Sequence, residues 1–304
     1  MTLEWPDRPR ILLSFAYRKS VTVNDSLAYL GGADVMIDSG AFTAFTQGKA
    51  IDMAEYTEWI LKERQRITHA AALDVIGDWK ASARNYERML SIVGDRLHVV
   101  PAWHIGSPLS ELLRLCKEAG YVAIGGCVPY AKRPKLLMRH LVQAHKVAQS
   151  SGAKLHGLGV TGRTTMTQLP WRSVDSSSWQ TGHQYGNMSL AGRAGEFVAI
   201  PFSRPLTLSQ SSLVRAYGGN PARVAAPNFN LVGKDGNPDR ARSDRTWVNM
   251  AAARSFMYVE GVLRRRHRSG LTLYLATPQA SYATEAVDAH KLGSPYPNTR
   301  EATS

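Results

Sequence analysis

Three aspartates, Asp38, Asp74 and Asp175, each end or interrupt a short apolar run of this chain. A carboxylate at the mouth of a buried strand is a common way to place chemistry in an active site. Two separated carboxylates suit glycosidic chemistry, in which one attacks the anomeric carbon and the other transfers the proton of the leaving group. A third can accept hydrogen bonds from adjacent N–H donors of a base such as guanine. We therefore expect one acidic pocket.

A strand-end carboxylate can also do the simpler work of capping the next helix. Asp78 precedes Trp79 and a helical pattern, so we expect it to be such a cap. Capping explains any one of the three aspartates, but it is a poorer explanation for three of them at three strand ends.

Short apolar runs alternate with helical patterns over the first two hundred residues, and this alternation must position the aspartates. Repeated strand, helix and strand predicts parallel strands with right-handed crossovers. The eight expected strands are 10–16, 34–38, 69–74, 97–103, 121–125, 154–160, 172–176 and 196–201. Expected helices include 53–66, 81–93, 108–119 and 135–150, with Ser107 and Gly120 flanking the third. Eight strands favour an α/β fold, a (β/α)₈ TIM-type barrel, and an open doubly wound sheet is the alternative. The barrel would be irregular at 161–171, which is short for a helix.

The pattern changes after about Ser203, where polar and glycine-rich stretches precede a long helical pattern at 244–268 that Ser243 can cap. We expect residues 1–203 to form the catalytic barrel and residues 204–304 to form a basic loop-and-helix extension packed on it.

The chain is strongly basic, with 37 Lys and Arg against 24 Asp and Glu and a net charge of +13. Such an excess favours a nucleic-acid partner, because phosphate contacts release counterions. The cations expected to hold phosphates are Lys132, Arg133, Arg163, Arg172, Arg264, Arg265 and Arg266. The alternatives are plain solubility for the net charge and a solvated helix end for the last three.

The remaining composition favours a protein of the reducing cytoplasm, or of the host cytoplasm if a phage encodes it. Cys116 and Cys127 form no C-x-x-C pair, which disfavours a disulfide scaffold and a cysteine-rich zinc site. The N-terminus has no signal-peptide layout, and no apolar run approaches the roughly 20 residues of a membrane helix.

Several of these motifs together resemble the tRNA-guanine transglycosylases, also called queuine tRNA-ribosyltransferases. The run Asp38-Ser39-Gly40-Ala41-Phe42 resembles that family's Asp-Ser-Gly-Gly-aromatic motif. Leu73-Asp74 resembles its base-recognition strand, and Ile124-Gly125-Gly126 its Gly-Gly loop. His156-Gly157-Leu158-Gly159 resembles its Met-Gly-Val-Gly strand, and Val174-Asp175 falls where it keeps the nucleophile. In its compact form, this chain looks more like the phage and bacterial relatives of that family, which exchange guanine in DNA for a free 7-deazaguanine base.

The resemblance implies a role for each matching residue. Asp175 would attack C1′ and hold the sugar covalently, and Asp38 would be the general acid and base. Asp74 would bind the base edge and Phe42 would stack on it, while Ser39 would orient Asp38.

The resemblance implies weaker roles for the other matching positions. The amides near Gly126 and Gly157, with Gly125 beside them, would hold the carbonyl and exocyclic groups of the base. His104 falls near a base-contacting glutamine of the family, and His156 replaces a stacking methionine, although a lone strand histidine is more often structural.

The chain also departs from the tRNA enzymes. Their zinc site uses three cysteines and one histidine near the C-terminus, and this chain has no cysteine after Cys127. We therefore expect no cofactor, although a zinc held by other ligands stays open. The chain is shorter than those enzymes, which favours DNA, where the target base must leave the stack.

Three other functions remain alternatives. One is the same base exchange on tRNA. Another is a metal-dependent barrel hydrolase, which typically carries His-x-His on its first strand, a motif that 11–16 lacks. The third is a non-catalytic nucleic-acid-binding barrel, for which the charge suffices but the aspartates have no use.

Overall fold

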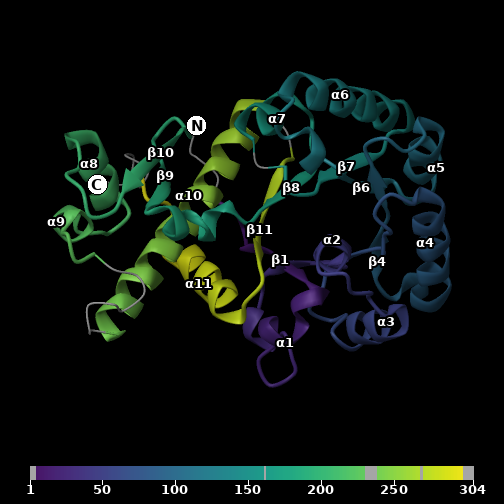
Figure 1. The fold of residues 1–304 in the computed structure, drawn as a ribbon, viewed down its shortest axis with the longest axis horizontal. Helices are drawn as coiled ribbons and strands as arrows, with labels where there is room; N and C mark the ends of the chain where they lie inside the picture. The colour runs from purple at the N-terminus through teal and green to yellow at the C-terminus, as the bar shows by residue number, and fades with distance from the viewer. Residues whose placement is uncertain (1–4, 161, 230–237, 268–269, 297–304) are drawn as a thin grey trace, which may run out of the picture. The chain divides into compact units, whose positions relative to one another are not determined.

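A computed structural model describes residues 5–160, 162–229, 238–267 and 270–296 (Figure 1). The strands are β1 (Arg10–Ser14), β2 (Asp34–Asp38), β3 (His69–Ala71), β4 (His98–Val100), β5 (Ala102–His104), β6 (Tyr121–Gly125), β7 (Lys154–Gly157), β8 (Ser173–Ser176), β9 (Asn187–Ala191), β10 (Phe197–Pro201) and β11 (Thr272–Thr277). The α-helices are α1 (Arg18–Val21), α2 (Ala41–Thr46), α3 (Met53–Lys62), α4 (Trp79–Val93), α5 (Leu109–Ala119), α6 (Pro134–Ser151), α7 (Arg163–Gln168), α8 (Leu208–Ala216), α9 (Pro221–Ala225), α10 (Pro238–His267) and α11 (Ala280–Lys291). Short 3₁₀ turns are η1 (Phe15–Tyr17), η2 (Ala28–Leu30), η3 (Gly94–Arg96), η4 (Val128–Tyr130), η5 (Ser178–Gln180) and η6 (Gly182–Tyr185).

The main sheet is parallel and has the strand order β4-β3-β2-β1-β11-β8-β7-β6-β5. Its two end strands follow one another in the chain and are separated by Pro101 alone. Proline has no N–H to give to a strand ladder, but the Pro101 carbonyl accepts from the Ala123 amide at 2.8 Å. The sheet is thus nearly closed into a barrel, with alternating helices α3 to α6 on its outside (Figure 1). The predicted TIM-type barrel is confirmed.

One predicted barrel strand is wrong. The segment predicted at 196–201 is β10, which pairs antiparallel with β9 in a separate two-stranded ribbon. The strand between β1 and β8 is β11, which lies about a hundred residues after β8 in the chain. Each β11 residue is buried, as expected for a parallel strand covered on both faces, whereas β10 is mostly half-exposed.

Cap chemistry explains where several barrel helices begin and end. The Asp78 carboxylate accepts from the Ala81 amide at 2.9 Å and caps α4, as predicted. Gly120 ends α5 in the left-handed conformation at φ 64°, also as predicted. Ser107 is not the cap of α5, because the N-cap position belongs to Pro108. The long helix predicted from 244 already begins at Pro238, so Ser243 lies within α10 instead of capping it.

The chain divides into two compact units that differ from the expected division at residue 203. The barrel unit comprises residues 10–176 and 269–280, and the other unit comprises 1–9, 177–268 and 281–304. The largest segment of the second unit, 177–268, is therefore inserted in the chain between barrel strands β8 and β11, because the strand that completes the barrel follows it.

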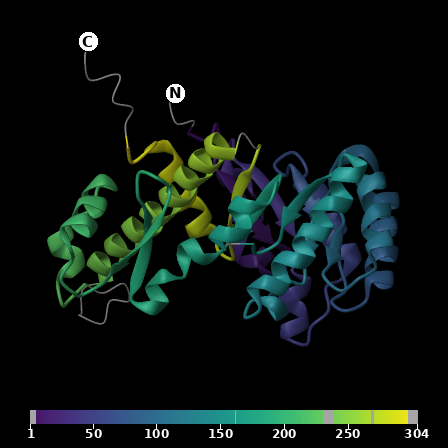
Figure 2. The same ribbon diagram turned by 90° about the horizontal axis from the view of Figure 1, so that it is seen from above.

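The second unit has its own core around the β9–β10 ribbon. Buried side chains of the ribbon, of α8 to α10 and of the adjoining loops form this core: Met188, Leu190, Ile200, Phe202, Val214, Tyr217, Val224, Phe229, Val248 and Ala251. Helix α10 packs against β9 (Figure 2). The Ser255 hydroxyl accepts from the Ala191 amide at 3.1 Å. In the described part of the chain, none of the helices combines the length and apolar character that crossing a bilayer requires.

The barrel interior is packed with apolar and aromatic side chains rather than open. Its buried cluster comprises Leu12, Met36, Val100, Tyr121, Ala123, Tyr274 and Ala276. Side chains of this cluster come from β1, β2, β4, β6 and β11, as in other filled β/α barrels. Functional groups are therefore confined to the two ends of the barrel and to a few polar side chains between them.

Candidate active site

The three aspartates come together at the carboxyl ends of β2, β3 and β8. Asp38 is the last residue of β2, Asp74 follows β3 and Asp175 lies in β8. The pKa of Asp38 is raised to about 7, first by burial and then by the nearby carboxylates of Asp74 and Asp175. The Gly40 amide, which donates to Asp38 Oδ2 at 3.0 Å, opposes this shift. The three predicted carboxylates thus lie close enough to interact, and Asp38 is poised to exchange a proton near neutral pH.

Asp74 is held by two donors, one on each oxygen. The Ser39 hydroxyl donates to Oδ1 at 3.1 Å, and His104 Nε2 lies 2.8 Å from Oδ2. Ser39 is fully buried and also accepts from the Ala41 amide at 3.2 Å. The expectation that Ser39 orients Asp38 and lines the substrate site is therefore wrong. It positions Asp74 instead, because its side chain points across to β3.

Asp175 is oriented through its Oδ1 atom. The Gly159 amide donates to Oδ1 at 2.8 Å, and His156 Nε2 lies 3.3 Å from the same oxygen. His156 is fully buried, and its Nδ1 atom hydrogen-bonds the Ser173 hydroxyl. A base cannot stack on a ring with no exposed surface, so His156 is a positioning residue for Asp175 rather than the expected substrate contact.

A polar chain continues from His156 into the barrel. The Ser173 hydroxyl shares one hydrogen bond with His156 Nδ1 and another with the Tyr121 hydroxyl. Ser173 and Tyr121 are both buried. The chain Tyr121–Ser173–His156–Asp175 therefore links the barrel interior to the carboxylate at its mouth.

Two of the predicted base-contacting glycines have internal roles. A Cβ on Gly125 would lie 2.7 Å from His104 Cδ2, and one on Gly157 would lie 2.7 Å from Val160 Cγ2. Both glycines are buried, so the absent side chains make room for the protein's own packing. Gly126 is half-buried with φ 74°, a backbone conformation that favours glycine, and it remains a candidate to face a ligand.

The rim of this mouth carries exposed aromatic and basic side chains. Phe42 lies on α2 directly after β2, and 52% of it is exposed, as a stacking ring must be. Lys132 and Arg133 are exposed on the loop between β6 and α6, which is at the same end of the barrel. These three predicted contacts are thus available to a ligand at the mouth.

Of the other predicted phosphate contacts, Arg172 is not at this mouth. Arg172 precedes β8 and lies at the amino end of the strands, opposite Asp175. Arg163 begins α7, but its side chain lies outside the described residues. Arg264, Arg265 and Arg266 belong to the second unit. There Arg264 pairs with Glu260 at 3.6 Å, and Arg266 donates to the Ala194 carbonyl at 3.0 Å.

The sequence did not single out two features of the mouth. The His104–Asp74 pair joins a histidine at the end of β5 to the carboxylate that follows β3. The thiol of Cys127, beside the Gly-Gly loop, has its pKa raised to about 11 by burial and by Asp175. Cys127 could have been noticed in the sequence because it directly follows Gly126. The pairing of His104 with Asp74 has no local sequence pattern.

The residues present do not fit a zinc site of the cysteine-rich kind. Among the residues that the structure describes, no group of three His, Cys, Asp or Glu side chains is placed to hold a metal ion. Cys116 is buried in α5, apart from the loop that carries Cys127. No family model, curated protein or solved structure matches this chain.

Proposed function

We propose that this protein is a transglycosylase that exchanges guanine in DNA for a 7-deazaguanine through a covalent aspartyl-sugar intermediate. The observation that carries the proposal is the pairing of two different carboxylates in one mouth. Asp38 has a pKa of about 7, suited to donating and accepting a proton. Asp175 is fixed by the Gly159 amide and His156, suited to attack in a defined direction.

In the first step Asp175 displaces guanine from the sugar. Within the described part of the chain, both hydrogen bonds of Asp175 go to Oδ1, so Oδ2 is the oxygen left to attack C1′. The new Oδ2–C1′ bond forms as the bond from C1′ to N9 of guanine breaks. Asp38 in its acid form gives its proton to the departing base, and the sugar passes through an oxocarbenium-like transition state.

In the second step the incoming 7-deazaguanine takes the place of guanine. Asp38, now ionised, accepts the N9 proton of the new base, and N9 attacks C1′ while the ester to Asp175 breaks. Two displacements at C1′ retain the configuration of the glycosidic bond. Asp38 ends protonated and Asp175 ends as a free carboxylate, so both groups are ready for another cycle.

Asp74 and Phe42 are the proposed contacts to the base. Each carboxylate oxygen can accept more than one hydrogen bond, so Asp74 can receive base N–H donors while it keeps Ser39 and His104. The exposed Phe42 ring supplies a stacking surface, and stacking of this kind is worth about 1–3 kcal/mol per base.

A basic protein is suited to holding a polyanionic strand while one nucleotide is turned out of the stack. The net charge of +13 and the exposed Lys132 and Arg133 near the mouth support a nucleic-acid substrate. The proposed place of action is the cytoplasm. The same chemistry on tRNA is the second candidate, since the carboxylates would act identically on either polymer.

Base exchange with labelled polymers tests this proposal. Duplex DNA and tRNA carrying labelled guanine are incubated in parallel with the protein and a free 7-deazaguanine, and released label is measured. We expect release from DNA that depends on the added base. Release from tRNA alone would assign the tRNA reaction, and release from neither polymer would contradict the transglycosylase proposal.

A further inference from the structure

A second pocket lies at the amino ends of the barrel strands, the end opposite the three aspartates. Its volume is about 330 Å³, within the range of small-molecule sites. Its polar lining comes from strand starts around the barrel: Asp34, His69, His98, Tyr121, Lys154 and Arg172. In β/α barrels this end usually serves stability, so a pocket of this size with titratable walls calls for an explanation.

The charge in this pocket is predominantly positive. Lys154 and Arg172 are exposed cations on its wall, and His69 and His98 add two imidazoles. Arg172 Nη1 donates to the Gly270 carbonyl at 3.1 Å, which fixes one end of its guanidinium and leaves further N–H donors on the same group. Two cations thus line the pocket, against the single carboxylate of Asp34. The two histidines add neutral N–H donors, because burial lowers the pKa of both imidazoles, that of His69 to about 4.

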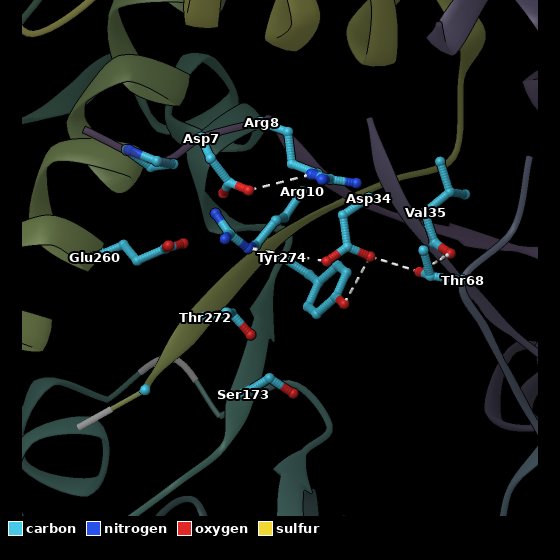
Figure 3. A network of polar contacts seen from close by, with 12 residues as sticks. Asp7, Arg8, Arg10, Asp34, Val35, Thr68, Ser173, Glu260, Thr272 and Tyr274 are labelled. Carbon is cyan, nitrogen blue, oxygen red and sulfur yellow. Dashed lines mark hydrogen bonds and ion pairs between the residues drawn. The ribbon is translucent and has the colours of Figure 1, made fainter. Parts of the chain in front are cut away.

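The carboxylate of Asp34 is already satisfied by the barrel itself. The hydroxyls of Thr68 and Tyr274 donate to its Oδ1 atom, the latter at 3.0 Å, and Arg10 Nε lies 3.9 Å from Oδ2 (Figure 3). The negative charge of Asp34 is therefore balanced by Arg10, and it offsets little of the positive charge of Lys154 and Arg172.

His69 lines the pocket and carries a polar atom that the protein does not use. Its Nδ1 is buried, and no group in the described part of the chain hydrogen-bonds it. Its ring lies 5.2 Å from the His98 ring and 5.5 Å from the Tyr121 ring, between centroids. A buried polar atom without a partner costs free energy of folding, and a ligand that hydrogen-bonds it removes that cost.

We propose that this pocket binds a phosphate group, either inorganic phosphate or the phosphate of a small monoester. A tetrahedral dianion can accept hydrogen bonds in several directions at once, from an ammonium, a guanidinium and imidazole N–H groups. The volume leaves room for a small organic part beside the phosphate, against the rings of Tyr121 and His98. The assignment stands independently of the base-exchange proposal, because it rests on the opposite end of the barrel.

Calorimetric titration of the full chain tests the site, with inorganic phosphate and glycerol phosphate as separate probes. Lys154→Met and Arg172→Gln remove one cation each, and Lys146→Met, an exposed lysine of α6 outside the pocket, is the matched control. We expect saturable binding to wild type, weakened about tenfold or more by each pocket variant and unchanged by the control. Tighter binding of one probe identifies whether free phosphate or a monoester is preferred.

Two further measurements keep the result interpretable. Thermal unfolding of each variant checks that the fold is intact, which the exposure of Lys154 and Arg172 favours. Asp175→Asn should keep wild-type phosphate affinity, because that residue lies at the other end of the barrel. No saturable binding to wild type at millimolar concentration, or equal affinity in wild type and both pocket variants, would overturn the proposal. Loss of phosphate binding in Asp175→Asn would overturn it as well.

Discussion

Strand β2 begins at Asp34 and ends at Asp38, and these two carboxylates have opposite surroundings. Residues four apart in a strand point to the same side, so both occupy the inner face of the barrel, one at each end. Asp34 is surrounded by donors from Thr68, Tyr274 and Arg10. Asp38 has two carboxylates as neighbours and a pKa of about 7.

This difference shows how one strand can carry two carboxylates in opposite settings, one held by the barrel and one that we propose to react. Donors and a cation stabilise the charge of Asp34 where it is, whereas burial and like charges make the charge of Asp38 costly. A group whose charge is costly near neutral pH exchanges its proton readily, which is what acid–base catalysis requires. The environment at each end of the barrel, rather than the residue type, makes the distinction.

The largest expected effect comes from removing the proposed nucleophile at the acidic end. We expect Asp175→Asn to lower the rate of guanine exchange by about 10⁴-fold or more, because no covalent intermediate can form. DNA binding, measured by fluorescence anisotropy, should stay near the wild-type level. Exchange at the wild-type rate in this variant would remove Asp175 from the mechanism.

Asp38 should give the next largest effect, together with a characteristic pH dependence. We expect Asp38→Asn to lower the exchange rate by about 10²–10⁴-fold, the usual contribution of a general acid and base. In wild type, single-turnover release of guanine should fall as the pH rises through about 7, because the acid form of Asp38 disappears. A wild-type release rate that does not change from about pH 6 to about pH 8 would contradict this role.

The same raised pKa predicts that Asp38→Asn, which should lower the exchange rate, raises the stability of the fold. Folding favours the protonated form of Asp38, so this group stabilises the fold at low pH and the contribution is lost as the pH rises through about 7. Asp38→Asn should therefore unfold at a higher temperature than wild type above that pH, with the difference shrinking at lower pH. An Asp38→Asn variant less stable than wild type at alkaline pH would show that the carboxylate is not strained there.

A smaller effect should come from the polar chain between the two ends. Ser173 bridges Tyr121 and His156, and His156 orients Asp175. We expect Ser173→Ala to lower kcat by about tenfold with little change in KM, because misplacing a reacting group costs rate rather than affinity. Ser173→Thr, which keeps the hydroxyl, should retain more activity than Ser173→Ala. Equal activity of wild type and Ser173→Ala would show that this chain plays no part in positioning the nucleophile.

The smallest effect on exchange should come from the basic end itself. Lys154→Met should exchange guanine at close to the wild-type rate while losing phosphate affinity, because Lys154 lies at the amino end of β7. Measuring both properties on one preparation separates the two ends directly. A large loss of exchange in a stably folded Lys154→Met would mean that the ends do not act separately.

The sequence revealed the three candidate carboxylates better than their partners. Apolar runs ending in Asp38, Asp74 and Asp175 follow from local pattern, and so does the barrel. The contacts of Ser39 with Asp74 and of His156 with Asp175 join different strands, and no local pattern encodes which neighbour a side chain faces.

Long-range topology explains the other differences. β11 is separated from its partner β8 by residues 177–268 of the second unit, so its place in the barrel is not evident from alternation along the chain. The position of Arg172 could have been predicted from the sequence, because a residue just before a barrel strand lies at the end opposite the active-site face.

The most direct test of the central claim is the intact mass of the protein after reaction with DNA, under denaturing conditions and after nuclease digestion. We expect the added mass of a base-free sugar phosphate in wild type, which peptide mapping places on the segment that contains Asp175, and no added mass in Asp175→Asn. An adduct that persists in Asp175→Asn, or that maps to Asp38, would contradict the assignment of nucleophile and acid at this end of the barrel.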